Sequence, residues 1–164
     1  MKKSVFINTF HQQGSLADDI LLTFLMTFAF AAYSYEARLD SGVLSAFRYV
    51  LLAVLLLTWL ITAAKNGINK KTGFIVYSAA YWLLPQLVIV LFYQGPEIFR
   101  HSVTMYTLSE FAAILTTRPA EILGGYCGIP HQMILVIMLL CIFGAFFVGA
   151  YFSDKDKTRS EKVN

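Results

Sequence analysis

Four long apolar runs, separated by short polar or charged segments, constrain this chain more than any other feature. About 20 apolar residues of helix are needed to cross a bilayer core about 30 Å thick. Inside that core only a helix or a closed barrel satisfies the backbone hydrogen-bonding groups. We therefore predict transmembrane helices over residues about 18–37, 43–64, 73–93 and 131–152. The expected fold is an all-α integral membrane protein with four transmembrane helices in a bundle.

The composition leaves little room for anything else. Of the 164 residues, 57% are hydrophobic and 14% are charged, against roughly 25% charged in a soluble domain. Four spans and their connections use nearly all of the length, so we expect residues 1–164 to form a single membrane domain. The lipid bilayer is the partner that this composition implies, and nothing in it favours nucleic acid.

The basic residues gather in alternate segments of the chain. They lie before the first span, between the second and third, and after the fourth: Lys2, Lys3, Lys65, Lys70, Lys71, Lys155, Lys157, Arg159 and Lys162. Such alternation is typical of loops that stay on the cytoplasmic side. We predict that both termini are cytoplasmic, that residues 153–164 form a cytoplasmic tail, and that the membrane is a cell membrane such as a bacterial inner membrane.

The first apolar run is interpreted as a true span rather than a secretory signal. It begins only at Ile20, after a long polar lead that ends in Asp18 and Asp19. A signal peptide has a short basic lead and no acidic pair at its apolar boundary. With Ser15, the acidic pair is predicted to mark the start of a helix, because negative charge favours a helix N-terminus, and not a cation site.

The second span is predicted to close at residues 64–67, where Lys65 and Gly67 are typical of a helix end. The short connection that follows predicts that the second and third spans are antiparallel neighbours. Within the second span, Arg48 lies five residues from the start. Its long side chain can anchor at the outer interface, where Glu36 or Asp40 could pair with it, or its charge can serve a ligand or a proton.

The third span has the most polar midpoint, formed by Trp82, Pro85 and Gln86. Proline frees a backbone carbonyl and bends a helix, and a buried glutamine needs a hydrogen-bond partner in lipid. Interrupted helices at mid-membrane hold the substrate in many transporters. The group indicates either a packing kink or a substrate site. With Arg48, these three residues are the candidates for a ligand site or pathway.

The segment between the third and fourth spans is predicted to contain an outer amphipathic helix over residues about 103–118. Its apolar positions recur at helical spacing: Leu108, Phe111, Ala112 and Leu115. We expect the helix to end at Arg118, before Pro119, and to be interfacial or re-entrant. Residues 124–130 hold three glycines and a proline and are predicted to make a tight turn into the fourth span.

The fourth span carries small residues every four positions, at Cys141, Ala145 and Gly149. Such a stripe lets another helix approach closely. It predicts a helix-packing interface, either within the bundle or with a homo-oligomer or membrane protein partner.

No catalytic or cofactor motif stands out. The sequence has no Gly-x-Ser-x-Gly and no Cys-x-x-Cys. Cys127 and Cys141 are not expected to pair with each other, and Cys127 is either a free or an intermolecular thiol. His101, Cys127 and His131 fall in one predicted outer region and are weak candidates for a metal site. We predict no metal and no cofactor.

Three functions remain open. The leading hypothesis is a non-catalytic subunit, assembly factor or regulator of a membrane complex, because the soluble surface is small and the small-residue stripe suits a partner. The alternative is an oligomeric small-solute or ion transporter with a site near the kink of the third span. The third is an enzyme at the outer interface that uses His101, Glu110 and His131.

Overall fold

The computed structural model describes residues 15–36 and 43–161, and every element in them is helical. Four helices are long: α2 (Leu16–Glu36), α3 (Val43–Ile68), α4 (Gly73–Gln94) and α8 (His131–Glu161). Between α4 and α8 come α5 (Glu97–Arg100), α6 (Val103–Ala112), the π-helical turn η1 (Ala113–Thr117) and α7 (Arg118–Cys127). Each of these four helices has the length and the apolar composition needed to cross a membrane. The prediction of an all-α membrane bundle is confirmed.

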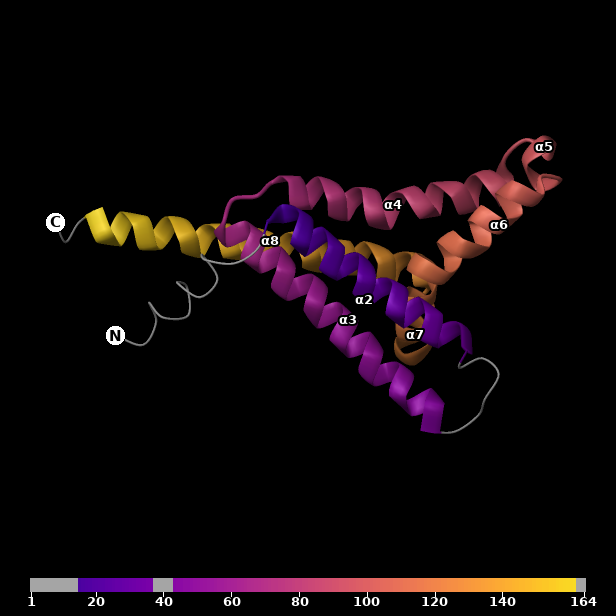
Figure 1. The fold of residues 1–164 in the computed structure, drawn as a ribbon, viewed down its shortest axis with the longest axis horizontal. Coiled ribbons are helices and arrows are strands. Elements are labelled where there is room, and N and C mark those ends of the chain that lie inside the picture. The colour runs from indigo at the N-terminus through magenta and orange to yellow at the C-terminus, as the bar shows by residue number, and fades with distance from the viewer. Residues whose placement is uncertain (1–14, 37–42, 162–164) are drawn as a thin grey trace.

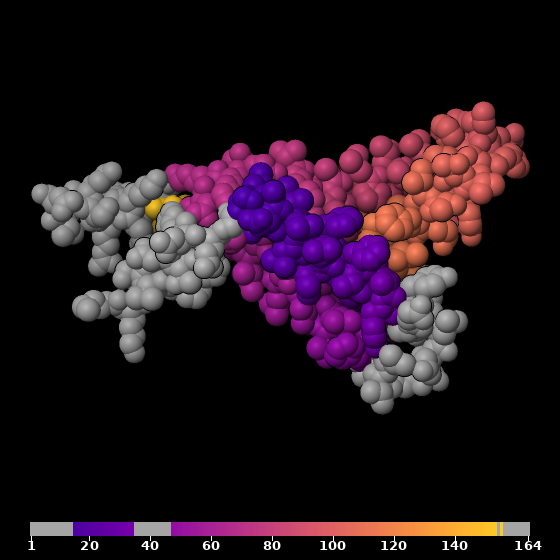
Figure 2. Space-filling model, in the orientation of Figure 1, coloured from indigo at the N-terminus to yellow at the C-terminus, as the bar shows by residue number. Residues whose placement is uncertain are grey.

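The distribution of side chains is that of a protein in lipid. Large apolar side chains cover the outside, among them Leu21, Leu22, Leu25, Val76, Leu83, Leu84, Leu140 and Phe147. Figure 2 shows one face of the molecule, on which α2 lies between α3 and α4. Small polar side chains are fully buried instead, among them Thr23, Thr27, Asn66, Ser78 and Thr116. An apolar surface of this extent is tolerated in a bilayer and not in water, so this is a multi-pass membrane protein.

The helices splay apart from one end of the bundle to the other (Figure 1). The end near the turn between α3 and α4 is named here the Lys65 end, and the opposite end the Arg48 end. α3 packs most extensively against α8 and also against α2, and only lightly against α4. Figure 1 shows α3 and α4 diverging from their connecting turn, with α2 between them and α8 continuing beyond the Lys65 end.

Two glycines let α3 and α8 approach closely. A Cβ atom on Gly67 would overlap the backbone carbonyl of Phe146, and one on Gly149 would overlap that of Ala64. α3 ends at Ile68, one residue past the predicted close, with Lys65 in its last turn. Gly67 has a second role, because it lets α8 approach closely. The left-handed residue of the turn that follows is Lys70, whose φ is 54°.

The predicted stripe of α8 divides between two environments. Gly149 is buried against α3 of the same chain, Ala145 is half-buried, and Cys141 is exposed on the outside of the bundle. Cys141 and Cys127 are both free thiols. The packing role that the structure gives this stripe lies within the bundle and is centred on Gly149.

The predicted end of the outer helix at Arg118 is wrong. The N–H of Arg118 donates to the carbonyl of Ala113, five residues back, so the helix widens by one π turn and continues as α7. Proline has no N–H and clashes with the carbonyl four residues back in an α-helix. A π turn just before Pro119 relieves both problems.

The turn before α8 is also shorter than the glycines suggest. Residues 124–127 are helical, and only Gly128, with φ of 68°, adopts the left-handed conformation that ends α7. Gly124 serves close packing instead, because a Cβ there would overlap the carbonyl of Ile129.

We expect Gly149→Ala to destabilise the bundle by about 1–3 kcal/mol, the usual cost of overpacking, because its Cβ meets the backbone of α3. Gly144→Ala is the matched control, since a Cβ at Gly144 on the same helix meets nothing within 4 Å. Reversible unfolding in mixed micelles, followed by circular dichroism, measures both. Equal stability of the two variants would contradict the close approach of α3 and α8.

Candidate functional site

A buried ion pair joins α2 to α3 at the Lys65 end. Asp19 is 3% exposed, and its carboxylate accepts from Nζ of Lys65 at 2.6 Å and from Nδ2 of Asn66 at 2.8 Å. Asn66 also donates to the carbonyl of Thr62. The carboxylate is thus satisfied from α3 by one cation and one amide.

The neighbouring Asp18 has a different role. Its carboxylate accepts from the backbone N–H of Ser15 at 2.7 Å, and its own N–H donates to the Ser15 hydroxyl at 3.2 Å. This reciprocal cap confirms that Asp18 marks a helix start. Asp19 was also predicted to mark the helix start, but its side chain is buried and faces α3. Polar residues at Asp19, Thr23 and Thr27, each four apart on an otherwise apolar helix, are the signal that could have revealed an inward polar face.

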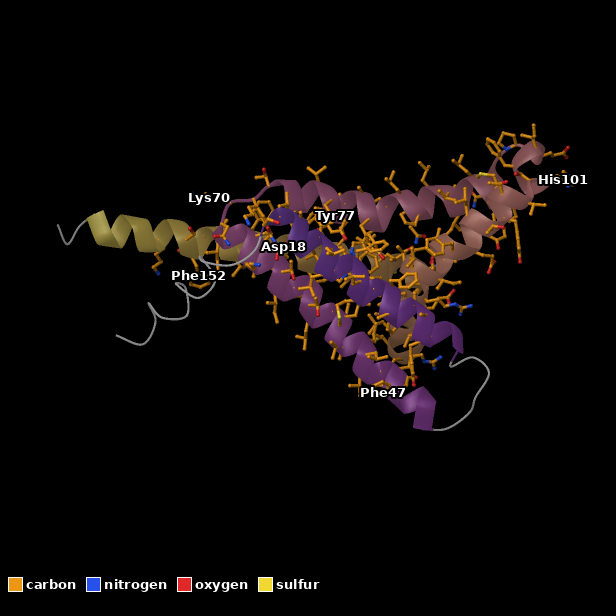
Figure 3. The ribbon with its side chains drawn as sticks, viewed as in Figure 1. Asp18, Phe47, Lys70, Tyr77, His101 and Phe152 are labelled. Carbon is orange, nitrogen blue, oxygen red and sulfur yellow. The ribbon has the colours of Figure 1, made fainter. Side chains whose placement is uncertain are left out.

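Two threonines of α2 continue this polar face toward the centre of the bundle. The hydroxyls of Thr23 and Tyr77 lie 3.1 Å apart, and the indole N–H of Trp59 donates to the Thr27 hydroxyl at 3.2 Å. Figure 3 shows Tyr77 on α4 beside the first half of α2. These contacts bring α2, α3 and α4 together through side-chain hydrogen bonds, which are strong determinants of helix pairing in lipid.

Aromatic rings fill the space between α3 and α4. The ring centroid of Trp59 lies 5.2 Å from that of Tyr81, 5.5 Å from that of Trp82 and 5.7 Å from that of Tyr77. Phe74 completes the group at 6.0 Å from Trp59. The prediction that the second and third spans are antiparallel neighbours is therefore confirmed. Their contact is made by large aromatic side chains, while the backbones of α3 and α4 stay apart.

One turn beyond Trp82, a glutamine joins α4 to η1. Nε2 of Gln86 donates to the hydroxyl of Thr116 at 2.8 Å and to that of Thr117 at 3.1 Å. Both threonines are buried within the π turn. Pro85 lies beside this link inside an uninterrupted α4, and because proline has no N–H, the Tyr81 carbonyl receives no helical hydrogen bond.

These buried polar and aromatic side chains are grouped here under the name polar seam. The seam consists of Asp19, Thr23, Thr27, Trp59, Thr62, Lys65, Asn66, Tyr77, Ser78, Tyr81, Trp82, Gln86, Thr116 and Thr117. It includes the sequence candidates Trp82 and Gln86, with Pro85 at its edge.

The seam is not fully satisfied. Within the described residues, two of its buried polar atoms make no hydrogen bond: Oδ1 of Asn66 and Nε1 of Trp82. The hydroxyl of Tyr81 interacts with the side chain of Thr27. Asn66 and Trp82 are almost completely buried. A buried polar group without a partner costs about 1–3 kcal/mol.

Two more polar atoms without a partner among the described residues lie at the Arg48 end, namely Oγ of Ser34 and Nε of Arg48. Nearby, an apolar groove of about 640 Å³ opens between the second half of α2 and the α6–η1 segment. Its lining is Phe28, Ala31, Ala32, Tyr33, Phe111, Ile114 and Leu115. This volume lies within the range of ordinary small-molecule sites.

The weak metal candidates are not brought together. Among the described residues, no group of three or more His, Cys, Asp or Glu side chains could hold a metal ion. His101 and Cys127 are exposed and His131 is half-buried. Figure 3 places His101 at the tip of the hairpin between α4 and α6, well away from the body of the bundle.

Comparison with known proteins gives no relative. No protein-family model matches the chain, and neither a curated protein nor a solved structure matches it significantly. The site is therefore interpreted from its own chemistry.

We expect Lys65→Met to destabilise the protein by about 3 kcal/mol, because it leaves the Asp19 carboxylate buried without its cation. Adding Asp19→Leu should recover most of that loss. Arg118→Met is the control: the Arg118–Glu121 pair is 2.8 Å long, but its side chains are 37% and 41% exposed, so its loss costs under about 1 kcal/mol. Chemical unfolding in micelles measures all three variants. Equal losses in the two single variants would mean that the Asp19–Lys65 pair is worth no more than a surface pair.

Proposed function

We propose that this protein is a non-catalytic membrane carrier of a small solute or ion, with its pathway along the polar seam. The observation that carries the proposal is the pair of buried polar atoms, Oδ1 of Asn66 and Nε1 of Trp82, that have no partner among the described residues. A helix bundle in lipid gains most by pairing every buried polar group internally. Groups left unpaired in its interior are those that a passing solute or water can satisfy.

The helices around the seam also support a carrier. Pro85 interrupts the hydrogen bonding of α4 beside Trp82, and η1 widens the next helical segment just before Pro119. Prolines and π turns are the usual places where helices bend. Gln86 links these two deformable segments through Thr116 and Thr117, so a movement of α4 would be coupled to the α6–η1–α7 segment.

A second candidate function is a subunit or regulator of a membrane complex. The stripe of α8 no longer argues for it, because Gly149 packs inside the chain. The hairpin between α4 and α6 does favour it: Ile98 is 75% exposed and Val103 is 80% exposed, at a tip that projects from the bundle (Figure 1). An apolar tip of this kind suits a protein partner.

The proposed orientation places the Lys65 end in the cytoplasm of a cell, with both termini on that side. Its support is the charge pattern, because Lys65, Lys70 and Lys71 border that end, as loops on the cytoplasmic side do. The α4–α6 hairpin and the groove then lie toward the outer side.

The carrier proposal predicts that water reaches the seam. Ser78 is fully buried on α4, and Ser78→Cys is nearly isosteric, so it reports access without disturbing packing. In a background with Cys127→Ser and Cys141→Ser, we expect a membrane-impermeant methanethiosulfonate reagent to modify Ser78→Cys in proteoliposomes. Mass spectrometry of the intact protein measures the reaction.

Gly125→Cys is the positive control, because Gly125 is exposed and a Cβ there meets nothing within 4 Å. Leu83→Cys is the negative control, being exposed on the apolar outside of α4. If Gly125→Cys reacts while Ser78→Cys stays unmodified from both sides of the membrane, the seam is a static core and the carrier proposal fails.

The subunit candidate predicts a foreign protein that purifies at fixed stoichiometry in mild detergent. We expect the double variant Ile98→Asn and Val103→Asn to release it, because the apolar tip would be lost. Tyr126→Asn on α7, where Tyr126 is 85% exposed, is the matched control. Native mass determination of the three preparations measures the change, and a partner retained by the double variant would argue against docking at the tip.

A further inference from the structure

Two kinds of contact hold the helices together at the Lys65 end. α3 and α8 approach backbone to backbone, because Gly67 and Gly149 leave room for the other helix. α2 packs against α3 and only lightly against α4. At this end α2 is joined to α3 by the carboxylate of Asp19, which contacts Lys65 at 2.6 Å and Asn66 at 2.8 Å. Asp19, Lys65 and Asn66 are named here the latch.

The latch lies at the Lys65 end of the polar seam. Lys65 is in the last turn of α3, and its side chain is 17% exposed, whereas that of Asp19 is 4% exposed. Thr23, whose hydroxyl contacts that of Tyr77, lies one helical turn, about 6 Å, further into the bundle than Asp19. A solute that enters the seam from the Lys65 end therefore meets the latch before the middle of the bundle.

The latch is a contact that water can replace. In a buried ion pair, the attraction between the charges does little more than offset the loss of their hydration. If α2 moves away from α3, both charges regain water. Asp18 is exposed and lies close enough to Lys65 for their charges to interact, so the ammonium also has a second partner at the surface. An apolar contact that becomes exposed to water has no such compensation.

We propose that the latch is a gate, which holds α2 against α3 when it is closed and admits water and solute to the polar seam when it opens. This inference rests on the proposed carrier function and adds the element that moves in it. That element is α2, while α3 and α8 stay joined through their glycines. The ion pair serves opening rather than stability, because well-packed apolar side chains would hold α2 and α3 together at least as firmly.

Distances between spin labels follow this movement in the full chain, in nanodiscs of phosphatidylcholine and phosphatidylglycerol. The background carries Cys127→Ser and Cys141→Ser. One label pair, Leu22→Cys with Ile61→Cys, joins α2 to α3 at exposed positions, and a second pair, Ile61→Cys with Phe147→Cys, joins α3 to α8. Double electron–electron resonance measures both pairs. The α3–α8 distance should stay the same in every variant, which shows that the bundle remains folded.

Lys65→Met should raise the population of a longer α2–α3 distance by about tenfold or more, because a carboxylate without its cation is stabilised by water and not by the closed bundle. Adding Asp19→Leu should return the chain to the shorter distance alone, since an apolar pair gains nothing from water. Asp18→Asn is the matched control. It removes the neighbouring acid and leaves the latch intact, so the shorter distance should stay dominant.

The double variant Asp19→Leu with Lys65→Met keeps the test independent of whether Lys65→Met folds. We expect it to be at least as stable as Lys65→Met in chemical unfolding. Its closed gate should nevertheless slow the modification of Ser78→Cys by the methanethiosulfonate reagent by about tenfold or more, relative to the chain with the latch intact. Stability recovered together with access lost is the combination that a gate predicts and a purely structural contact does not.

Three results would overturn the proposal. Equal α2–α3 distances in the wild type, Lys65→Met and the double variant would make the latch a static contact. A longer distance in the double variant, as in Lys65→Met, would mean that the ion pair serves assembly alone. Equal reaction of Ser78→Cys with and without the latch would mean that the latch controls no access.

The gate and the carrier can fail separately in this experiment. A changed α2–α3 distance with Ser78→Cys unreactive in every background would support the movement of α2 and remove the carrier. A reactive Ser78→Cys with unchanged α2–α3 distances would remove the gate and leave a carrier whose entrance lies elsewhere.

Discussion

The hydrocarbon core of a bilayer offers no hydrogen-bond partner, and the rest of this structure follows from that constraint. Apolar side chains face outward at little cost, so the polar side chains of the spans must find partners within the bundle. They do so along the seam, where Asp19 meets Lys65 and Asn66, Trp59 meets Thr27, and Gln86 meets two threonines. The backbones of α3 and α8 approach each other closely at Gly67 and Gly149, and α2 packs against α3.

Because the bilayer core supplies no hydrogen-bond partner, the buried polar atoms that lack one within the protein are informative. Among the described residues, buried polar atoms without a partner occur along the whole bundle: Oδ1 of Asn66 at the Lys65 end, Nε1 of Trp82 at the centre, and Oγ of Ser34 and Nε of Arg48 at the Arg48 end. A polar atom buried in this way is costly. The unpartnered atoms of the interior are therefore the feature on which the carrier proposal depends.

Particular residues show where sequence reasoning reached its limit. The four spans were predictable because hydrophobicity and length act locally, and Trp82 and Gln86 stood out because polar groups are rare at mid-span. Asp19 and Lys65 were taken for a helix start and a loop charge, since nothing local to either position reveals that they meet across 46 residues. Pro119 was expected to follow a helix end, because proline's local preference is to end helices, and a π turn overrode that preference. Gly67 does lie at the end of α3, but nothing local showed that it also carries the contact with α8.

The sequence by itself determined that this chain forms a helical membrane protein and which segments are its long helices, because burial in lipid is decided by runs of residue type. Only the tertiary structure decided which side chains face inward together, which glycines carry helix contacts, and which polar groups stay unpaired. Those properties depend on the rotation and register of helices far apart in the chain, and no local pattern fixes either.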